Sequence, residues 1–404
     1  MRASPGVDQG SRSTGLAFAA LALILAVVGC GGSPASPSPS LSQTASPNPT
    51  VAPTPSPTPS PMPTPTFVAT GSMHVARMDA TATLLQDGKV LIAGGADMQV
   101  VPYDEVVSSA ELYDPSTGKF TPTGSMRTAR SNATATLLAD GRVLIAGGYG
   151  SSVNVLASAE LYDPTTGKFT PTESMSVARV DASAMLLPDG RVLMLNGGDS
   201  RAEVYDPATG KFTRDGSLLN FYDSSAATFL PNGKVLVAGA VALIGPGAEL
   251  YDPANGKSAS ISLDLPSGAA AAARNDYDEA PETATLLKDG RVLLCVFDYL
   301  VTYDPLTDSF MQPGSISAPA QWNLPTTTLL PDGQVLFAGG RDSSGAAVRS
   351  AGLYDPASGF HMIGPMIEAR SDQTATLLPD GTVLIAGGIG DEQEAFSSAE
   401  LLRP

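Results

Sequence analysis

The chain has 404 residues, 43% of them hydrophobic, so it is long and apolar enough for one large domain with additional segments. It carries 23 basic and 40 acidic residues, a net charge of −17. This charge repels phosphate backbones and anionic lipid headgroups, and no run of Lys or Arg offsets it, so we expect no nucleic-acid partner. Two cysteines, Cys30 and Cys295, are too few for a disulfide framework.

The N-terminal segment has the pattern of a bacterial lipoprotein signal. An uncharged run of about fifteen residues, Gly15 to Gly29, suits a signal peptide better than a membrane span. Val27-Val28-Gly29-Cys30 resembles the lipobox, in which small residues precede a cysteine that receives lipid. We predict a signal peptide over residues 1–29 and lipidation of Cys30, with an ordinary secretory signal or an uncleaved anchor as alternatives. The protein would then lie in the bacterial cell envelope, facing outside the cytoplasm and contacting the membrane only through its lipid.

Residues 30–66 follow as a stalk rich in Pro, Ser and Thr. Twelve prolines fall between residues 33 and 66, and this composition cannot bury enough apolar surface to fold. In a polyproline-like conformation of about 3.1 Å per residue, the segment reaches on the order of 100 Å. We expect a disordered stalk that holds the following domain away from the membrane.

From residue 67 onward one motif recurs seven times. Its clearest copy is Leu137 to Gly148, which reads Leu-Leu-Ala-Asp-Gly-Arg-Val-Leu-Ile-Ala-Gly-Gly. Two apolar runs joined by Asp-Gly predict a β-hairpin, because glycine supplies the positive φ that tight hairpin turns need. Successive turn glycines lie 43 to 57 residues apart, at Gly88, Gly141, Gly190, Gly233, Gly290, Gly333 and Gly381. This period is typical of propellers.

The second copy of the motif predicts four strands. Ala133 to Leu138 is the first, and Arg142 to Ala146 is the second, whose unbroken apolar run indicates burial on both faces. Ala159 to Tyr162 is the third, and an Asp-Pro-Thr-Thr-Gly turn leads to the fourth, Lys168 to Thr170. Four antiparallel strands make one propeller blade.

The Asp-Gly hairpin, the Gly-Gly pair after strand two and the Tyr-Asp-Pro-x-x-Gly-x-Phe turn resemble kelch repeats, especially those of galactose oxidase and its relatives. The resemblance implies an all-β, seven-bladed kelch-type β-propeller over residues 67–404, with about 50 residues per blade and no single activity. Phe67 to Gly71 aligns with Phe120 to Gly124, whereas the last copy stops after its third strand. We therefore expect the N-terminal segment to supply the outer strand of the last blade, which removes an open edge.

The position just before strand one is often arginine. In chain order the seven copies read Arg77, Arg130, Arg179, Tyr222, Glu279, Trp322 and Arg370. Four arginines near an axis could bind an anion. However, strand three carries a glutamate in the same four blades, at Glu111, Glu160, Glu203 and Glu400, and blades five and six lack both residues. Blade four breaks the match, since it keeps Glu249 without an arginine. The co-occurrence favours ion pairs inside each blade over an anion site.

Blades four to six depart from the repeat, so we place the candidate ligand site there. The loops after Gly-Gly and the segments before strand one share one face of a propeller, here called the variable-loop face, where loops can change without disturbing strands. An aromatic and polar crescent is predicted there for stacking a sugar ring or holding a peptide, made of Tyr222, Tyr277, Glu279, Trp322 and Arg341. Decay of the repeat with ordinary packing of these aromatics is the alternative.

These features favour a surface-displayed, lipid-anchored binding module that acts as a monomer and recognises a glycan or a protein. No calcium-loop pattern is present, and we predict no metal or other cofactor and assign no catalytic residue. The alternative is a carbohydrate-active enzyme, such as a sialic-acid hydrolase or an epimerase-like enzyme, although the Ser-x-Asp-x-Gly-x-x-Trp box of sialidases is absent. Galactose oxidase relatives also imply a copper radical oxidase with two histidine ligands, but His74 and His361 fall at dissimilar positions in the repeat.

Overall fold

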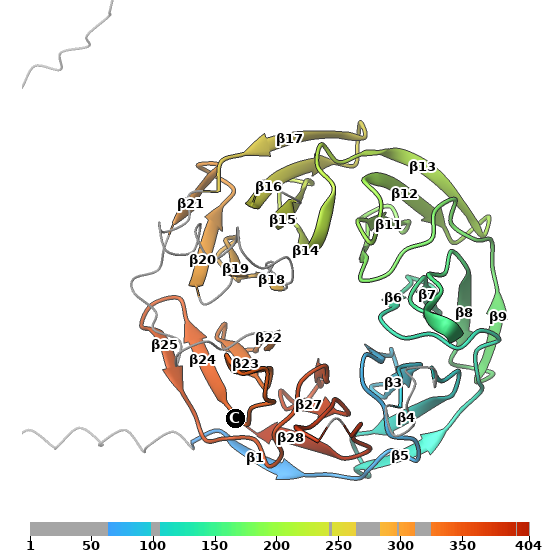
Figure 1. Cartoon of the computed structure of the whole chain (residues 1–404), viewed down its shortest axis with the longest axis vertical. Helices are drawn as coiled ribbons and strands as arrows, with labels where there is room; N and C mark the ends of the chain where they lie inside the picture. Colours follow the sequence, from blue (N-terminus) through green and yellow to red (C-terminus); the bar gives the residue numbers. More distant parts are fainter. Residues whose placement is uncertain are drawn as a thin grey trace, which may run out of the picture. The chain divides into compact units, whose positions relative to one another are not determined.

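Seven antiparallel sheets of four strands each surround a central axis (Figure 1). The computed structural model describes residues 64–97, 106–241, 245–263, 283–296, 299–311, 325–392 and 394–403, all within one unit, Pro61–Pro404. The single helix in these ranges is a 3₁₀ turn, Ser151–Val153. The chain therefore folds as the all-β, seven-bladed propeller that the repeat predicts.

Blades one to six take their strands in chain order from the axis outward, whereas the outer strand of blade seven is β1. Blade one contains β2 (Thr81–Leu84), β3 (Val90–Ala93), β4 (Ala110–Asp114) and β5 (Lys119–Pro122); blade two contains β6 (Thr134–Leu137), β7 (Val143–Ala146), β8 (Ala159–Asp163) and β9 (Lys168–Pro171). Blade three contains β10 (Ser183–Leu186), β11 (Val192–Leu195), β12 (Arg201–Asp206) and β13 (Lys211–Ser217). Blade four contains β14 (Tyr222–Phe229), β15 (Val235–Val241), β16 (Gly245–Asp252) and β17 (Lys257–Ile261).

The remaining blades follow the same order. Blade five contains β18 (Thr283–Leu286), β19 (Val292–Val296), β20 (Tyr299–Asp304) and β21 (Ser309–Met311). Blade six contains β22 (Thr326–Leu329), β23 (Val335–Ala338), β24 (Ala351–Asp355) and β25 (Gly359–Met362). Blade seven contains β26 (Thr374–Leu377), β27 (Val383–Ala386), β28 (Ala399–Arg403) and β1 (Thr66–Ala69).

The Asp-Gly hairpins form as the sequence predicts. In blade two Gly141 has φ 87° and donates its N–H to the carbonyl of Leu138 at 3.0 Å. The carboxylate of Asp140 accepts the N–H of Arg142 and so fixes the turn from the other side. The following strand, β7, is buried at all four positions because neighbouring blades cover both of its faces.

The hydrophobic core lies between neighbouring blades. Leu91 of blade one packs in one cluster with Val143 and Ile145 of blade two, and similar clusters fill the other seams that the structure describes. Hydrogen bonds between hydroxyl groups also connect neighbouring blades. The hydroxyl of Tyr162 in blade two lies 2.9 Å from that of Thr123 at the end of blade one. Each blade is thus held mainly by its two neighbours.

The first strand closes the ring. β1 pairs antiparallel with β28 over four residues, with Thr66 opposite Arg403. Directly after β1, the hydroxyl of Thr70 lies 2.8 Å from that of Tyr113 in blade one. The expected closure by the N-terminal segment is confirmed, so the two ends of the propeller chain share blade seven.

Blade four differs because its strands continue where the others stop. In blade two, Gly147 and Gly148 have φ values of 70° and 92° and end strand two. In blade four, Gly239 and Ala240 remain in β15 and pair with β16. The loss of the second glycine therefore converts a strand end into a longer regular hairpin.

Some predictions concern residues outside the described ranges. The predicted signal peptide, Cys30 and almost all of the predicted stalk belong to this group. Among the described residues, no helix is long and apolar enough to cross a membrane. The second cysteine, Cys295, lies in β19 and is partly rather than fully buried, against the core cluster between blades five and six.

Candidate functional site

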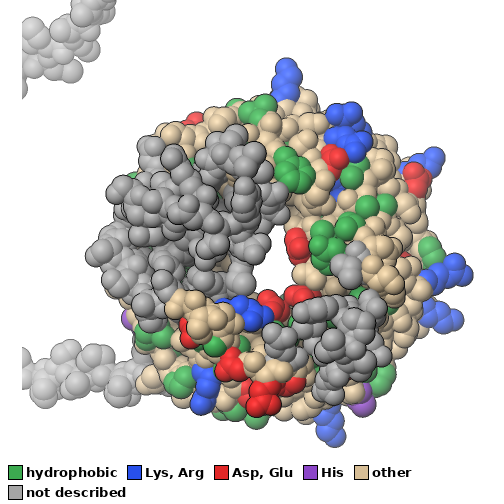
Figure 2. Space-filling view, viewed as in Figure 1, with side chains coloured by type: hydrophobic (Ala, Val, Ile, Leu, Met, Phe, Trp, Pro, Cys, Tyr) green, Lys and Arg blue, Asp and Glu red, His purple; other side chains and the backbone are tan. Residues whose placement is uncertain are grey.

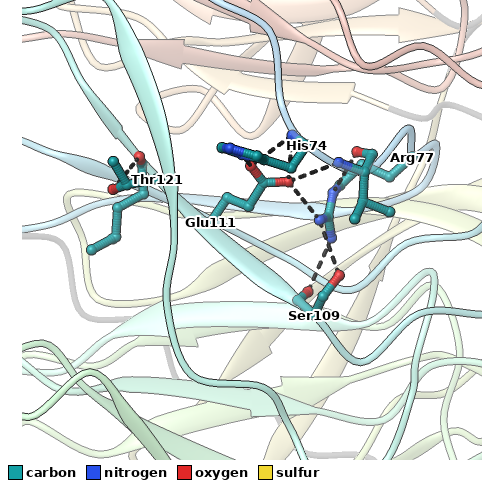
Figure 3. A network of polar contacts seen from close by, with 7 residues as sticks. His74, Arg77, Ser109, Glu111 and Thr121 are labelled. Atoms are coloured by element: carbon teal, nitrogen blue, oxygen red, sulfur yellow. Dashed lines mark hydrogen bonds and ion pairs between the residues drawn. The ribbon is translucent and has the colours of Figure 1, made fainter.

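Arg77 ties the segment before strand one of blade one to the strands behind it (Figure 3). We call this segment, Met73–Arg77, and its equivalents the lead-in segments. Nη1 of Arg77 donates to the carbonyl of Gly94 at 2.7 Å and to that of Ser109 at 3.0 Å. Nη2 forms an ion pair with Oε1 of Glu111 at 3.1 Å, and the arginine side chain is fully buried. One guanidinium thus joins the lead-in segment to strands two and three.

Glu111 completes this network from strand three. Its carboxylate accepts the backbone N–H groups of His74 and Val75 as well as the guanidinium of Arg77. Burial acts to raise the pKa of Glu111, but these hydrogen bonds and the arginine charge outweigh it, so the pKa lies below its ordinary value. The carboxylate therefore stays charged and holds the lead-in segment in place.

The same pair recurs in the other regular blades. The distances are 3.3 Å for Arg130–Glu160, 3.1 Å for Arg179–Glu203 and 3.3 Å for Arg370–Glu400, and each arginine side chain is at most 1% exposed. The interpretation as ion pairs within blades is confirmed. Because these arginines are buried and paired, they do not offer an open site for an anion.

Blade four lacks the arginine but keeps the glutamate. Tyr222 replaces the arginine, is 2% exposed, and packs in the core cluster between blades three and four. Glu249 is fully buried and accepts the N–H groups of Leu219 at 2.8 Å and Asn220 at 3.2 Å. Burial and the nearby charge of Glu249 raise the pKa of Tyr222 above its ordinary value. The hydroxyl of Tyr222 lies near the side chains of Asn220 and Glu249 but makes no well-aligned hydrogen bond among the described residues.

Arg130→Met should destabilise the propeller by about 3–5 kcal/mol, because it leaves the buried charge of Glu160 without its partner. Arg130→Met combined with Glu160→Gln should cost less, since it leaves no unpaired buried charge, although the amide has one oxygen where the carboxylate accepts the two N–H groups on two oxygens. Urea unfolding measures both. Arg142→Met is the control, because its ion pair with Asp140 is partly exposed and should change stability by less than about 1 kcal/mol. Equal costs for Arg130→Met and Arg142→Met would contradict the assigned role.

A polar collar surrounds the axis on the variable-loop face. It consists of the residues two positions after the lead-in arginines, Asp79, Asn132, Asp181 and Asp372, all with φ between 49° and 56°. Backbone hydrogen bonds connect them across the blades, from Asp181 N–H to Asn132, from Asn132 to Asp79, and from Asp79 to Asp372, at 3.0–3.2 Å. Asp and Asn tolerate this left-handed backbone better than most residues. Hydrogen bonds within the collar thus connect four neighbouring blades beside the axis.

The collar is acidic but not uniformly so. Figure 2 shows acidic side chains and a basic one around the central opening. Nη2 of Arg341 in blade six pairs with Asp372 at 2.9 Å, and the amide of Asn132 donates to Asp181 at 3.0 Å. Burial raises the pKa of Asp79 to about 7, and the charges of Asp372 and Asp181 add to this effect. Asp79 therefore changes its protonation state near neutral pH.

Asp79→Asn should stabilise the propeller more at pH 8 than at pH 5. Because the pKa of Asp79 is higher in the folded chain than in the unfolded chain, its contribution to stability is complete below the unfolded pKa and is lost as the pH rises through 7. The gain from the substitution should grow by about 1–3 kcal/mol between the two pH values. Urea unfolding at both pH values checks this.

Asp87→Asn is the matched control for this experiment. Asp87 lies in an exposed hairpin turn of the same blade, and blade four already has Asn232 in the equivalent place. Its ion pair with Lys89 is exposed, so the substitution should change the free energy of unfolding by less than about 1 kcal/mol. A gain that is the same at pH 5 and pH 8 for Asp79→Asn would contradict the assigned titration.

The structure describes two of the five predicted crescent residues. Tyr222 is buried, so its ring packs in the core rather than facing a ligand in this conformation. Arg341 is about one-third exposed and contacts the collar through Asp372. Tyr277, Glu279 and Trp322 lie outside the described residues. The crescent stays a prediction, and of its two described residues Arg341 contacts the collar.

The collar itself was missed by sequence reasoning. The signal was present as a repeated Arg-x-Asp or Arg-x-Asn triplet in blades one, two, three and seven. Nothing local in the sequence distinguishes a turn at the axis from one at the rim. The four triplets meet only because the ring closes.

Comparisons with known proteins agree with the fold. Residues 130–176 match the kelch motif, whereas no curated protein matches the chain. Among solved structures, a fungal alcohol oxidase of the AA5 family, in complex with copper, is similar, with a TM-score of 0.63 and 18% identity over 84% of this chain and 76% of that chain. At this identity the likeness shows the fold alone. The chain is thus a propeller that contains a kelch motif and has the fold of the AA5 oxidase.

The described residues of this chain contain no set of side chains that fits the copper of that oxidase. His74 lies in the lead-in segment of blade one with Nδ1 2.8 Å from Glu111, whereas His361 lies in β25, the outer strand of blade six. In the described ranges, no three His, Cys, Asp or Glu side chains are placed to hold a metal ion. We derive no step through copper.

Proposed function

We propose that this protein is a lipid-anchored binding module whose variable-loop face recognises a glycan or a protein outside the cytoplasm. The observation that supports this most is the polar collar, which places three carboxylates and an arginine at the centre of that face. Kelch propellers commonly act as interaction modules, and the site rather than the fold must carry the function.

The charge of the collar is not needed for the fold. Blade two has Asn132 in the left-handed position that Asp79, Asp181 and Asp372 occupy in other blades, so a neutral side chain satisfies the backbone there. Three like charges near one axis cost stability through repulsion. Charged groups that lower the stability of a fold are candidates for a binding role. We infer that the collar faces a ligand with hydrogen-bond donors or positive charge.

The sialic-acid enzymes considered from the sequence receive little support from this geometry. Such enzymes hold the sugar carboxylate with arginines, and the four lead-in arginines are buried against glutamates. An acidic collar also repels an anionic sugar. We therefore propose binding, and we propose no reaction.

Arg341→Ala and Trp322→Ala should each weaken ligand binding at least about tenfold, the loss of roughly one charged hydrogen bond or one stacking contact. The measurement is a screen of residues 64–404 on a glycan array and, in parallel, capture of cell-surface proteins, followed by titration of each ligand found. Leu306→Ala is the control, because Leu306 is 93% exposed in the turn between β20 and β21 on the opposite face. Binding that survives both variants unchanged would place the ligand elsewhere.

The anchor is tested separately from the ligand. Cys30→Ser should abolish incorporation of labelled fatty acid and move the protein from the membrane pellet to the supernatant, because the cysteine thiol is the proposed lipid acceptor and lipid supplies the membrane affinity. Residues 64–404 are unaffected by this change, so ligand binding should persist. A Cys30→Ser protein that stays labelled and membrane-bound would refute the lipoprotein assignment.

A further inference from the structure

The regular seams between blades are closed by one repeated contact. Gly94 of blade one approaches the carbonyl of Arg130 in blade two so closely that a Cβ would lie 2.3 Å from that oxygen. The next residue, Gly95, donates its N–H to the same carbonyl at 2.9 Å. The seams that follow blades two, six and seven have the same bond, from Gly148, Gly340 and Gly388. The backbone of a Gly-Gly pair thus contacts the backbone carbonyl of the lead-in arginine in the next blade.

The seam between blades three and four has lost both partners of this contact. Asn196 stands where the first glycine is required elsewhere, and Tyr222 stands where the arginine is required. Among the described residues, Gly197 forms no bond like that of Gly95. Because Asn196 has a Cβ, it could not approach an arginine carbonyl as Gly94 does. The two replacements therefore belong to one change in the seam.

Buried polar atoms remain without partners at this seam. Asn196 is 3% exposed and donates its amide to the hydroxyl of Ser225 at 2.6 Å, but its Oδ1 has no partner among the described residues. The Tyr222 hydroxyl lies near Asn220 and Glu249 but makes no well-aligned hydrogen bond there. Burying such groups without hydrogen bonds costs free energy. That cost disappears when the seam opens and water forms hydrogen bonds with them. The closed seam is therefore less favourable than its regular counterparts.

The lead-in segment of blade four is also held by fewer bonds. Its backbone is tied to Glu249, through the N–H of Leu218 to the carbonyl of Ser200, and at its end by the pairing of Tyr222 with Val241. It has no guanidinium that reaches strands two and three, as Arg77 does in blade one. Two of its apolar side chains already face solvent, Leu219 at 60% and Phe221 at 44% exposure. Leu218 and Tyr222 on either side are buried in the core cluster between blades three and four, so movement confined to Leu219–Phe221 would uncover little additional apolar surface.

We propose that Leu219–Phe221, the part of the blade-four lead-in segment between the buried residues Leu218 and Tyr222, is a flap that opens the variable-loop face at the seam between blades three and four. Opening releases the N–H groups of Leu219 and Asn220 from Glu249 and lets water or a ligand reach Asn196 and Tyr222. The proposal concerns the unliganded chain and goes beyond the binding function proposed above. It gives that face an adaptable position beside the four lead-in segments that buried arginines hold in place.

Hydrogen exchange of the full chain tests the flap against internal controls. In the folded protein, the amides of Leu219 and Asn220 donate to Glu249 just as those of Arg127 and Thr128 donate to Glu160. After correction for intrinsic rates, we expect exchange in blade four to be at least tenfold faster than at Arg127 and Thr128. Equal protection of the two pairs would overturn the proposal.

A restored seam gives the second measurement. Asn196→Gly with Tyr222→Arg rebuilds the contact of the regular blades and should slow exchange in blade four to the level of blade two. Fast exchange that persists in a double variant with an unchanged circular dichroism spectrum would also overturn the proposal. If the double variant does not fold, the comparison of the two pairs of amides within the natural chain decides the question alone.

Discussion

The buried ion pair between a lead-in arginine and a strand-three glutamate is the interaction on which the regular part of the propeller depends. A buried pair alone is weak evidence of stability, because desolvation offsets much of the attraction. Here the arginine also satisfies two backbone carbonyls, and the glutamate satisfies two backbone N–H groups, as Arg77 and Glu111 show. The pair therefore replaces backbone partners that the irregular lead-in segment would otherwise lack.

This arrangement explains how the collar can exist. Once the arginine fixes the lead-in segment, the chain must turn sharply to enter strand one, and the residue two positions later takes the left-handed conformation. Such conformations persist where the surroundings determine them. The position of Asp79 is determined from three sides, by Arg77 in its own blade and by hydrogen bonds with Asp372 and Asn132 in the neighbouring blades. The ion pairs between lead-in arginines and strand-three glutamates thus position the polar collar, whose residues are not members of those pairs.

Features encoded within one repeat could be predicted from sequence, and features created by the ring could not. Asp140-Gly141 specifies its hairpin locally, and the alignment of Phe67 with Phe120 was enough to predict closure. The pairing of arginine with glutamate could be inferred because both residues disappear from the same blades. The collar joins residues as distant as Asp79 and Asp372. The burial of Tyr222 was foreseeable in principle, since it occupies the position of a residue that is buried in every regular blade.

Arg341 connects the two parts of the proposed binding face. It was selected as a crescent residue of the irregular blades, and in the structure it pairs with Asp372 of the regular blades. At about one-third exposure it reaches solvent, unlike the lead-in arginines. A ligand that contacts Arg341 would therefore also alter the electrostatic environment of Asp372, and through it that of Asp79, whose pKa both residues influence. Binding at the irregular blades and protonation at the collar are thus expected to be thermodynamically linked, each changing the other by the same free energy.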